Sequence, residues 1–363
     1  MASIYKRGNT WTANIFVIKD GKRRRKTKSG FKTKAQAKGW ANEMEVAKQN
    51  NTLTLRSDML FADFYDNWFV TFKAPTITKA TSRWYLYVSK SIRDYFPNTK
   101  IEDVTRIKFQ SFLNSFGKTH GVNTARKMRT LIKQVAVAAI ADGYISKDFT
   151  YRTNITGQEP KSADLKFLEE DDMKALADYI SSKPLTIRSV TDMMIITALQ
   201  SGARYAEIAG LEWQDVNFEK GFIRIETTWD QFYKEFKPTK TKSSIRNIDM
   251  PSSYMDELYD WHQLHPDTTF VFQGKNDIPP TSNAANKQLR RDLDDIGATK
   301  IITFHGLRHT HASWLLAHDV DLHYVSERLG HSNTTITLNT YSHLLKTRRN
   351  SEIDKSISLL SNL

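Results

Sequence analysis

The sequence predicts a multidomain protein that is mainly α-helical with small β-sheets. Its 363 residues exceed what one hydrophobic core usually serves, so two or three domains are expected. Apolar residues form 39% of the chain and charged residues 26%, which excludes collagenous, low-complexity and wholly disordered proteins. Most long segments repeat apolar residues at spacings of three and four, as helices do, and only a few short runs are typical of strands.

Residues 1–55 are predicted to form a three-stranded sheet backed by one helix. Asp20-Gly21 separates two runs of strand character, and this dipeptide is a strong signal for a two-residue hairpin. A helix is expected over 34–49, with Thr33 as its N-cap. The sheet face away from that helix is expected to be exposed, with Arg23, Arg25 and the neighbouring lysines on it.

Basic residues are concentrated in this first segment. The whole chain carries a net charge of +13, and residues 1–56 alone carry +11. Such a charge favours a polyanionic partner, and a basic β-ribbon can enter a groove of DNA. The alternatives are a solvated face or a nuclear-localisation stretch. The candidate DNA contacts are Lys22, Arg23, Arg24, Arg25, Lys26 and Lys28.

The segment 58–150 is predicted to be a bundle of about four helices. Their expected ranges are 59–72, 78–95, 105–116 and 122–142. The aromatic residues of these helices are interpreted as core. Polar stretches at 51–57 and 147–164 mark the two ends of the bundle.

The segment 165–363 is predicted to be a mixed α+β domain. Strands are expected at 215–226 and 243–250, with a turn near Lys237-Pro238 between them. A short amphipathic tail helix is expected at 351–363, docked either in cis or on a neighbouring protomer. The remaining helices are expected at 169–181, 188–201, 204–211, 254–264, 284–296, 305–317 and 322–329.

Four short motifs follow one another in the C-terminal half. They are Ser201-Gly202-Ala203-Arg204-Tyr205-Ala206-Glu207, Lys240-Thr241-Lys242, His305-Gly306-Leu307-Arg308-His309-Thr310-His311, and Leu329-Gly330-His331 followed by Tyr341. Their order resembles the signature of the tyrosine recombinases, specifically the integrases of temperate phages and integrative elements: Arg, Lys, His-x-x-Arg, His and a late Tyr. The matching residues are Arg204, Lys240, His305, Arg308, His331 and Tyr341.

The resemblance covers essentially the whole chain. That subfamily also carries an N-terminal sheet domain that binds arm sites and a helical domain that binds core sites. The resemblance therefore implies an arm-site DNA-binding domain at 1–55, a core-site-binding domain at 58–150 and a catalytic domain with a tail helix at 165–363.

The residue types also fit the chemistry of phosphodiester cleavage. Charge develops on the phosphoryl oxygens, and the guanidiniums of Arg204 and Arg308 can neutralise it through bidentate contacts. A tyrosine hydroxyl has an unperturbed pKa of ~10, so Tyr341 needs positive charge and a base nearby. His305 is the candidate base.

The resemblance implies two further roles. His331 donates a hydrogen bond to a non-bridging phosphate oxygen, and a lysine protonates the departing 5′ oxygen. Lys240 aligns best with that lysine, but Lys242 would point the same way on a strand and stays open. Glu207 is interpreted as a structural partner of Arg204.

The remaining histidines are not expected to bind a metal. His305 and His309 have the spacing of a zinc-binding pair, but Arg308 between them opposes a cation, so no metal is expected. Residues His309, His311, His318, His323 and His343 lie outside the signature and are interpreted as structural or solvent-facing.

The function implied is site-specific recombination of double-stranded DNA. The enzyme would cleave and rejoin attachment core sites through a 3′-phosphotyrosyl intermediate as a homotetramer, integrating and excising a phage or mobile element. No cofactor is expected, because rejoining reverses the cleavage step. An accessory DNA-bending or excision factor is left open. The alternatives are a type IB topoisomerase-like enzyme and a non-catalytic DNA-binding protein of the same fold.

The cellular compartment follows from what the chain lacks. The absence of cysteine excludes disulfide scaffolds and thiolate metal sites and fits a reducing bacterial cytoplasm. The longest purely apolar run, Val135 to Ala141, is too short to span a membrane, and the N-terminus lacks the apolar stretch of a signal peptide.

Overall fold

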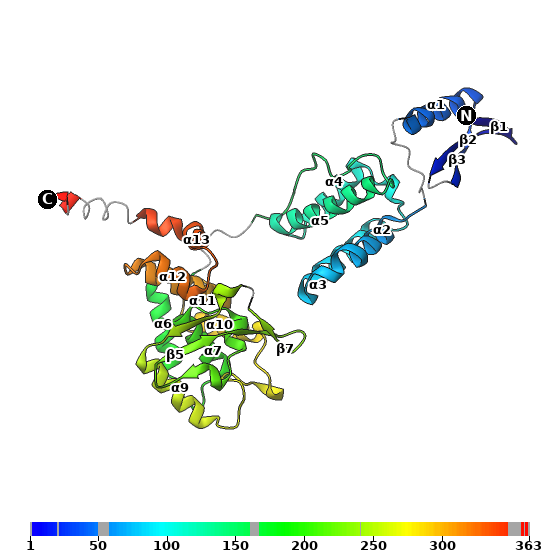
Figure 1. Cartoon of the computed structure of the whole chain (residues 1–363). Helices are drawn as coiled ribbons and strands as arrows, with labels where there is room; N and C mark the ends of the chain where they lie inside the picture. The colour runs from blue at the N-terminus through cyan, green and yellow to red at the C-terminus, as the bar shows by residue number, and fades with distance from the viewer. Residues whose placement is uncertain are drawn as a thin grey trace. The chain divides into compact units, whose positions relative to one another are not determined.

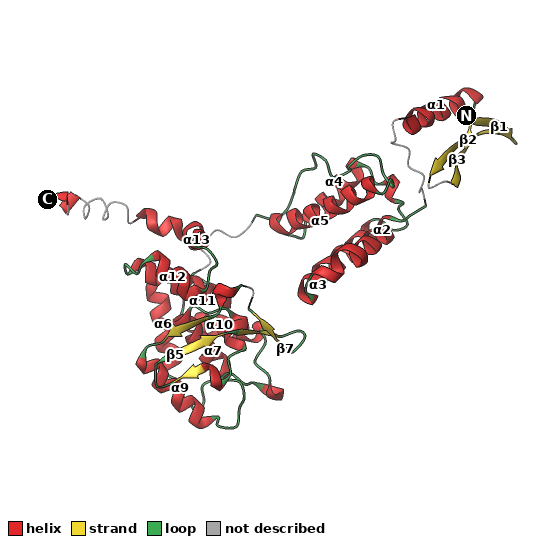
Figure 2. Cartoon of the chain, viewed as in Figure 1, coloured by secondary structure: helices red, strands yellow, loops and turns green. Residues whose placement is uncertain are grey.

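A computed structural model describes residues 2–19, 22–49, 58–159, 167–239, 241–347, 357–358 and 360–361. The chain divides into two compact units, Met1–Pro160 and Lys161–Leu363 (Figure 1). Both contain helices and small antiparallel sheets, as Figure 2 shows by colour. Within the described ranges, no helix has the length and apolar character needed to cross a membrane.

The N-terminal part is the predicted three-stranded sheet with one helix. Strands β1 (Ser3–Arg7), β2 (Thr10–Lys19) and β3 (Lys22–Phe31) are antiparallel in the order β1-β2-β3, and α1 (Lys34–Gln49) packs on β2. Lys19 pairs with Lys22, which is the register that a two-residue hairpin requires. The turn residues Asp20 and Gly21 lie outside the described residues. The strands and the helix of this segment are thus confirmed.

The register divides the basic residues of β3 between the two faces of the sheet. Ala13 packs with the alanines of α1, and Lys28 pairs with Ala13, so Lys28 and Lys26 occupy the face toward α1. Arg25 occupies the opposite face and is exposed. The prediction that the lysines share the exposed face is therefore wrong for Lys26 and Lys28, because side chains alternate along a strand. The side chains at 22–24 lie outside the described residues.

The predicted four-helix bundle is confirmed. Its core contains a series of edge-to-face ring contacts, which runs from Phe96 to Phe61, then to Phe149 and to Phe109. The first helix continues through a π-helical turn (Phe69–Lys73) and a 3₁₀ turn (Ala74–Thr76) that contains Pro75. The helices are α2 (Phe61–Trp68), α3 (Lys79–Tyr95), α4 (Arg106–Gly117) and α5 (Val122–Ala141).

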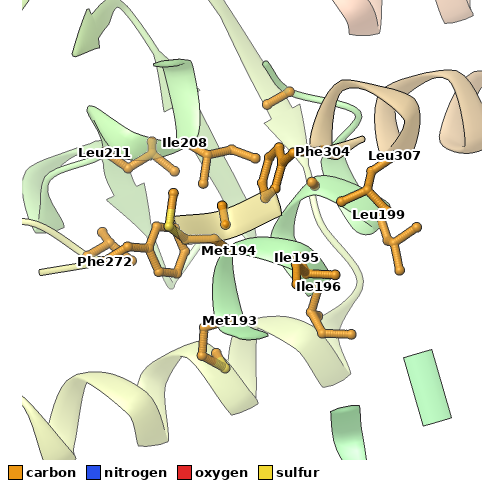
Figure 3. Close-up of a cluster of buried hydrophobic side chains, with 14 of the residues drawn as sticks. Met193, Met194, Ile195, Ile196, Leu199, Ile208, Leu211, Phe272, Phe304 and Leu307 are labelled. Atoms are coloured by element: carbon orange, nitrogen blue, oxygen red, sulfur yellow. The ribbon is translucent and has the colours of Figure 1, made fainter. Parts of the chain in front are cut away.

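The second unit is built around the buried helix α7 (Val190–Ser201), which packs against α10 (Ser282–Asp295) and α11 (Phe304–Ala317). Figure 3 shows Met194 and Leu199 of α7 in one apolar cluster with Phe304 and Leu307 of α11. The other helices are α6 (Glu170–Ser181), α8 (Tyr205–Ala209), α9 (Ser252–Leu264), α10 (Ser282–Asp295), α11 (Phe304–Ala317), α12 (Leu322–Leu329) and α13 (Thr334–Thr347). All but α13 were predicted from the apolar spacing.

The strands of this unit differ from the prediction. Strands β4 (Val216–Asn217), β5 (Phe222–Ile225) and β8 (Arg246–Asp249) form one sheet, and β6 (Thr227–Asp230) and β7 (Glu235–Pro238) form a separate hairpin.

The single strand predicted at 215–226 is wrong, because Gly221 adopts a φ of +69° and closes a turn between β4 and β5. The turn predicted at Lys237-Pro238 is also wrong. The Asp230 carboxylate accepts backbone N–H groups from Phe232 and Tyr233, which starts the turn there instead.

The predicted tail helix lies almost entirely outside the described residues. Ile357 and Leu360 are described, and their exposed fractions are 57% and 66%. Its docking in cis or in trans stays a prediction.

Candidate active site

Five of the six signature residues come from four neighbouring parts of the second unit. Arg204 begins α8, His305 and Arg308 lie on α11, His331 follows α12, and Tyr341 lies on α13. Helix α13 packs against α11 and α12. The fold thus brings together residues that are up to 137 positions apart in the sequence.

Arg204 is anchored by Glu207. The guanidinium Nη1 donates to Oε1 of Glu207 at 2.6 Å, and the backbone N–H of Arg204 donates to Oε2 at 2.8 Å. The Glu207 carboxylate is buried, whereas the Arg204 side chain is 37% exposed. Glu207 therefore fixes the position of a partly exposed guanidinium, as expected of a structural partner of Arg204.

Arg308 is buried and fixed by backbone carbonyls. Nη1 donates to the carbonyl of Gly202 at 2.9 Å, and Nη2 donates to that of Leu329 at 2.7 Å. Burial, and then the charge of Arg204, lower the pKa of Arg308 to about 9, so the guanidinium is still charged at neutral pH. Gly202 is required here, because its φ is +66° and a Cβ would lie 2.5 Å from Cδ2 of His311.

A third arginine, Arg246, connects the segments that surround these two. Its Nη2 donates to Oε2 of Glu207 at 3.0 Å, its Nε to the carbonyl of Arg328 at 2.6 Å, and its Nη1 to the carbonyl of Ser244 at 2.9 Å. Arg246 thus links the partner of Arg204 to the segment that precedes His331. Arg246 was not predicted from the sequence, because nothing local distinguishes it among 53 basic residues.

His305 and His331 are both neutral at pH 7. Burial lowers the pKa of His331 to about 4, with further contributions from Arg308 and Arg204. Desolvation, followed by the same two charges, also lowers the pKa of His305, although its side chain is partly exposed. Nδ1 of His331 lies 2.7 Å from the hydroxyl of Thr337. If that hydroxyl donates to Nδ1, Nε2 carries the hydrogen and can donate to a phosphate oxygen.

Tyr341 is 2% exposed and packs with apolar residues of α11 and α12. Burial raises the pKa of its hydroxyl, and the Arg308 charge opposes this shift. The hydroxyl oxygen lies 2.9 Å from Nδ1 of His309. His309 was interpreted as structural or solvent-facing. The sequence does not reveal this contact, because the distance between His309 and Tyr341 depends on where α13 packs.

Lys240 and Lys242 were the two candidates for the lysine of the signature. Lys240 lies outside the described residues. Lys242 begins a 3₁₀ turn, Lys242–Ser244, so the prediction that it continues a strand from Lys240 is wrong. The polar run that precedes β8 favours this turn over an extended chain.

The remaining histidines occupy several environments. His311 is buried and bonded to the Leu199 carbonyl and to Nε of Arg328, so its structural interpretation is confirmed. His318 and His323 are exposed. The side chain of His343 lies outside the described residues. In the part of the chain that is described, no three histidine or acidic side chains are grouped to hold a metal ion.

We predict that Glu207→Gln destabilises the protein by about 3 kcal/mol at pH 7, because it leaves the buried Arg246 without its counter-charge. Burial raises the pKa of Glu207, but Arg246 and Arg204 more than offset this and lower it below 4.5. The carboxylate thus stabilises the fold above pH 4.5, and the difference shrinks as the pH falls through the lowered pKa. Urea unfolding across pH measures it.

Glu226→Gln is the matched control. Glu226 pairs with Arg224, and both side chains are about half exposed. The expected loss is below about 1 kcal/mol. Equal losses for the two variants would contradict the role given to Glu207.

Models of known families match three consecutive stretches of the chain. They are the arm DNA-binding domain at residues 3–48, the phage integrase central domain at 61–155 and the phage integrase family at 166–348. The last match alone spans half of the chain.

Individual relatives are distant but extend over most of the sequence. The chain is 24% identical to a XerC-like tyrosine recombinase of Caldanaerobacter subterraneus subsp. tengcongensis, over 94% of each protein. It is 23% identical to the ICEBs1 integrase of Bacillus subtilis, over 75% of this chain and 76% of that protein.

Two sets of solved structures share the fold. The Tn1549 transposon integrase in complex with a circular intermediate DNA matches 82% of this chain and 99% of its own at a TM-score of 0.69 and 19% identity. A lambda integrase dimer bound to a core site matches 93% of each chain at a TM-score of 0.61 and 16% identity.

Proposed function

Because the chain belongs to the phage integrase family and is a DNA strand-transferring tyrosine recombinase, we propose that Tyr341 is its nucleophile and that Arg204 and Arg308 bind the scissile phosphate. The observation that carries this proposal is that the charges of Arg204 and Arg308 act on both His305 and His331, and that the Arg308 charge also acts on Tyr341. The arginines come from different elements.

The proposed reaction transfers a phosphoryl group twice. The Tyr341 oxygen forms a bond to phosphorus while the bond from phosphorus to the 5′ oxygen breaks, which leaves a 3′-phosphotyrosyl link. The two arginines neutralise the charge on the non-bridging oxygens, and His331 donates a hydrogen bond to one of them. A lysine gives the 5′ oxygen its proton. Attack by a 5′ hydroxyl from another strand reverses these changes and completes the exchange.

The partner is double-stranded DNA. We propose that residues 58–150 and 165–363 bind attachment core sites, and that residues 1–55 bind arm sites through the basic strand β3. A lambda integrase tetramer bound to a Holliday junction shares this fold at a TM-score of 0.59. We propose the same tetrameric assembly for this chain. We also propose that it acts in a bacterial cytoplasm, where it integrates and excises a phage or mobile element. An accessory bending or excision factor is a further proposal.

We predict that deletion of residues 1–55 spares cleavage of an isolated core site and impairs integration between two complete sites. The deletion removes most of the net positive charge of the chain. The slope of binding affinity against salt, on logarithmic axes, is expected to fall by roughly 0.9 for each phosphate that the shortened protein no longer neutralises. Binding titrations at several salt concentrations measure this slope.

Lys174→Gln controls for a change of surface charge, since Lys174 is exposed on α6 and pairs with Glu170. An unchanged slope with unchanged integration would mean that the basic sheet is only a solvated face. A topoisomerase-like enzyme would relax DNA without requiring residues 1–55.

We propose Lys240 as the general acid, and this assignment has its own test. Lys240→Ala is expected to lose cleavage of ordinary DNA and to recover it on DNA that carries sulfur in place of the 5′ bridging oxygen. A thiolate leaves without a proton, so the acid becomes dispensable. Lys242→Ala is the matched control and is expected to cleave both substrates. Recovery by the Lys242 variant instead would transfer the role to Lys242.

A further inference from the structure

We propose that His309 accepts the proton of the Tyr341 hydroxyl during DNA cleavage. This role rests on the proposed function, in which Tyr341 is the nucleophile. It falls on a residue outside the signature of the family and replaces the candidate base His305.

Geometry distinguishes His309 from His305. Nδ1 of His309 lies 2.9 Å from the Tyr341 oxygen, the distance of a hydrogen bond, and the two ring centroids are 5.8 Å apart. His305 lies one helical turn earlier on α11, and the described residues give it no hydrogen bond to Tyr341. A general base must reach the proton that it removes, and in this arrangement His309 does.

The surroundings of Tyr341 make a base necessary. Its ring is buried among Ala312, Leu316, Val325 and Leu329, and burial disfavours the phenolate. Water has little access to a side chain that is 2% exposed. His309 is half-buried and is therefore less enclosed than Tyr341.

A guanidinium and two further imidazoles lie near His309. Arg308 precedes it on α11, the ring of His305 lies 5.0 Å away edge to face, and His331 lies close enough for the two imidazoles to influence each other. The bound phosphate supplies the negative charge that stabilises an imidazolium at 309.

The O–H bond of Tyr341 breaks and its proton moves to Nδ1 of His309, while the tyrosyl oxygen forms its bond to phosphorus. The 5′ oxygen leaves with its bonding pair and takes a proton from the general acid. In the rejoining step, the imidazolium of His309 returns its proton to the tyrosyl oxygen as this oxygen leaves phosphorus.

The test is the rate of covalent adduct formation on a nicked suicide substrate, measured in single turnover across pH with the full-length protein. His309→Ala and His309→Gln are both expected to slow the adduct by about 100-fold or more, the usual contribution of a general base. The Gln amide can hold the hydroxyl by a hydrogen bond, but it cannot take the proton. Imidazole in solution is expected to accelerate the Ala variant and not the Gln variant, because only Ala leaves room for it.

Controls separate this role from a structural one. His323→Ala removes an exposed histidine on α12 and is expected to keep the parent rate. Substrate with sulfur at the 5′ bridging position is expected not to rescue the His309 variants, because their defect lies at the nucleophile. Half-site binding and melting temperature show which variants fold. If His309→Gln does not fold, imidazole rescue of the folded His309→Ala variant decides.

Three results would overturn the inference. A Gln variant at the parent rate would mean that His309 only orients Tyr341. The absence of imidazole rescue in a folded Ala variant would exclude proton transfer at this position. Loss of the acidic limb of the pH profile in His305→Ala, with its retention in His309→Ala, would make His305 the base. An adduct that survives in Tyr341→Phe would instead overturn the proposed function.

Discussion

Tyr341→Phe is expected to reduce covalent attachment to DNA by more than about 10⁴-fold, because the variant lacks the atom that bonds to phosphorus. Binding of a single half-site is expected to change little, since the proposed arginine contacts to phosphate remain. The fold is expected to lose only about 1 kcal/mol, the net value of one hydrogen bond to His309. Trapping on a nicked suicide substrate measures the adduct, and a filter or gel assay measures binding.

Tyr324→Phe is the matched control for this substitution. Tyr324 lies on α12 and is 46% exposed, so the loss of its hydroxyl is expected to leave adduct formation unchanged. An undiminished adduct in the Tyr341 variant would move the nucleophile to another residue.

Arg308→Lys is expected to slow cleavage by about 10³-fold although the charge is kept. The guanidinium uses Nη1 and Nη2 to hold two carbonyls, from Gly202 and Leu329, and in the proposed site it also faces the phosphate. An ammonium is a point charge on a flexible stem and cannot keep this planar geometry. Loss of one preorganised donor at a reacting oxyanion costs about 10²- to 10³-fold in comparable enzymes.

Arg224→Lys provides the comparison at an exposed site, where the partner is Glu226. This control is expected to cleave DNA at the parent rate. The melting temperature of the Arg308 variant must be measured together with its rate, because loss of the two buried hydrogen bonds to these carbonyls also destabilises the fold. Near-normal cleavage by a folded Arg308→Lys enzyme would remove Arg308 from the site.

Local patterns predicted the helices well. Helices α1 and α12 have the bounds expected from apolar spacing, and Thr33, the expected N-cap of α1, accepts the backbone N–H of Gln36. These features depend on residues a few positions apart, which the sequence displays directly. The same holds for the register of the N-terminal hairpin.

Interactions between distant segments could not be predicted in the same way. The contact of His309 with Tyr341 requires the position of α13, and the contacts of Arg246 require both α8 and the end of α12. The hairpin β6–β7 was missed because its turn is set by the Asp230 carboxylate and contains neither Gly nor Pro. The order of the signature predicted which residues meet, but their hydrogen-bond partners came from the structure.

The central claim is that Tyr341 becomes covalently linked to a 3′ phosphate, and the most direct test is to identify the linked residue by mass spectrometry. Trypsin is expected to release residues 329–346, a peptide in which Tyr341 is the only tyrosine. After trapping on a suicide substrate and nuclease digestion, the account predicts the mass of a phosphorylated nucleotide remnant on this peptide, localised to Tyr341. A remnant on any other residue, or a trapped complex with peptide 329–346 unmodified, would contradict it.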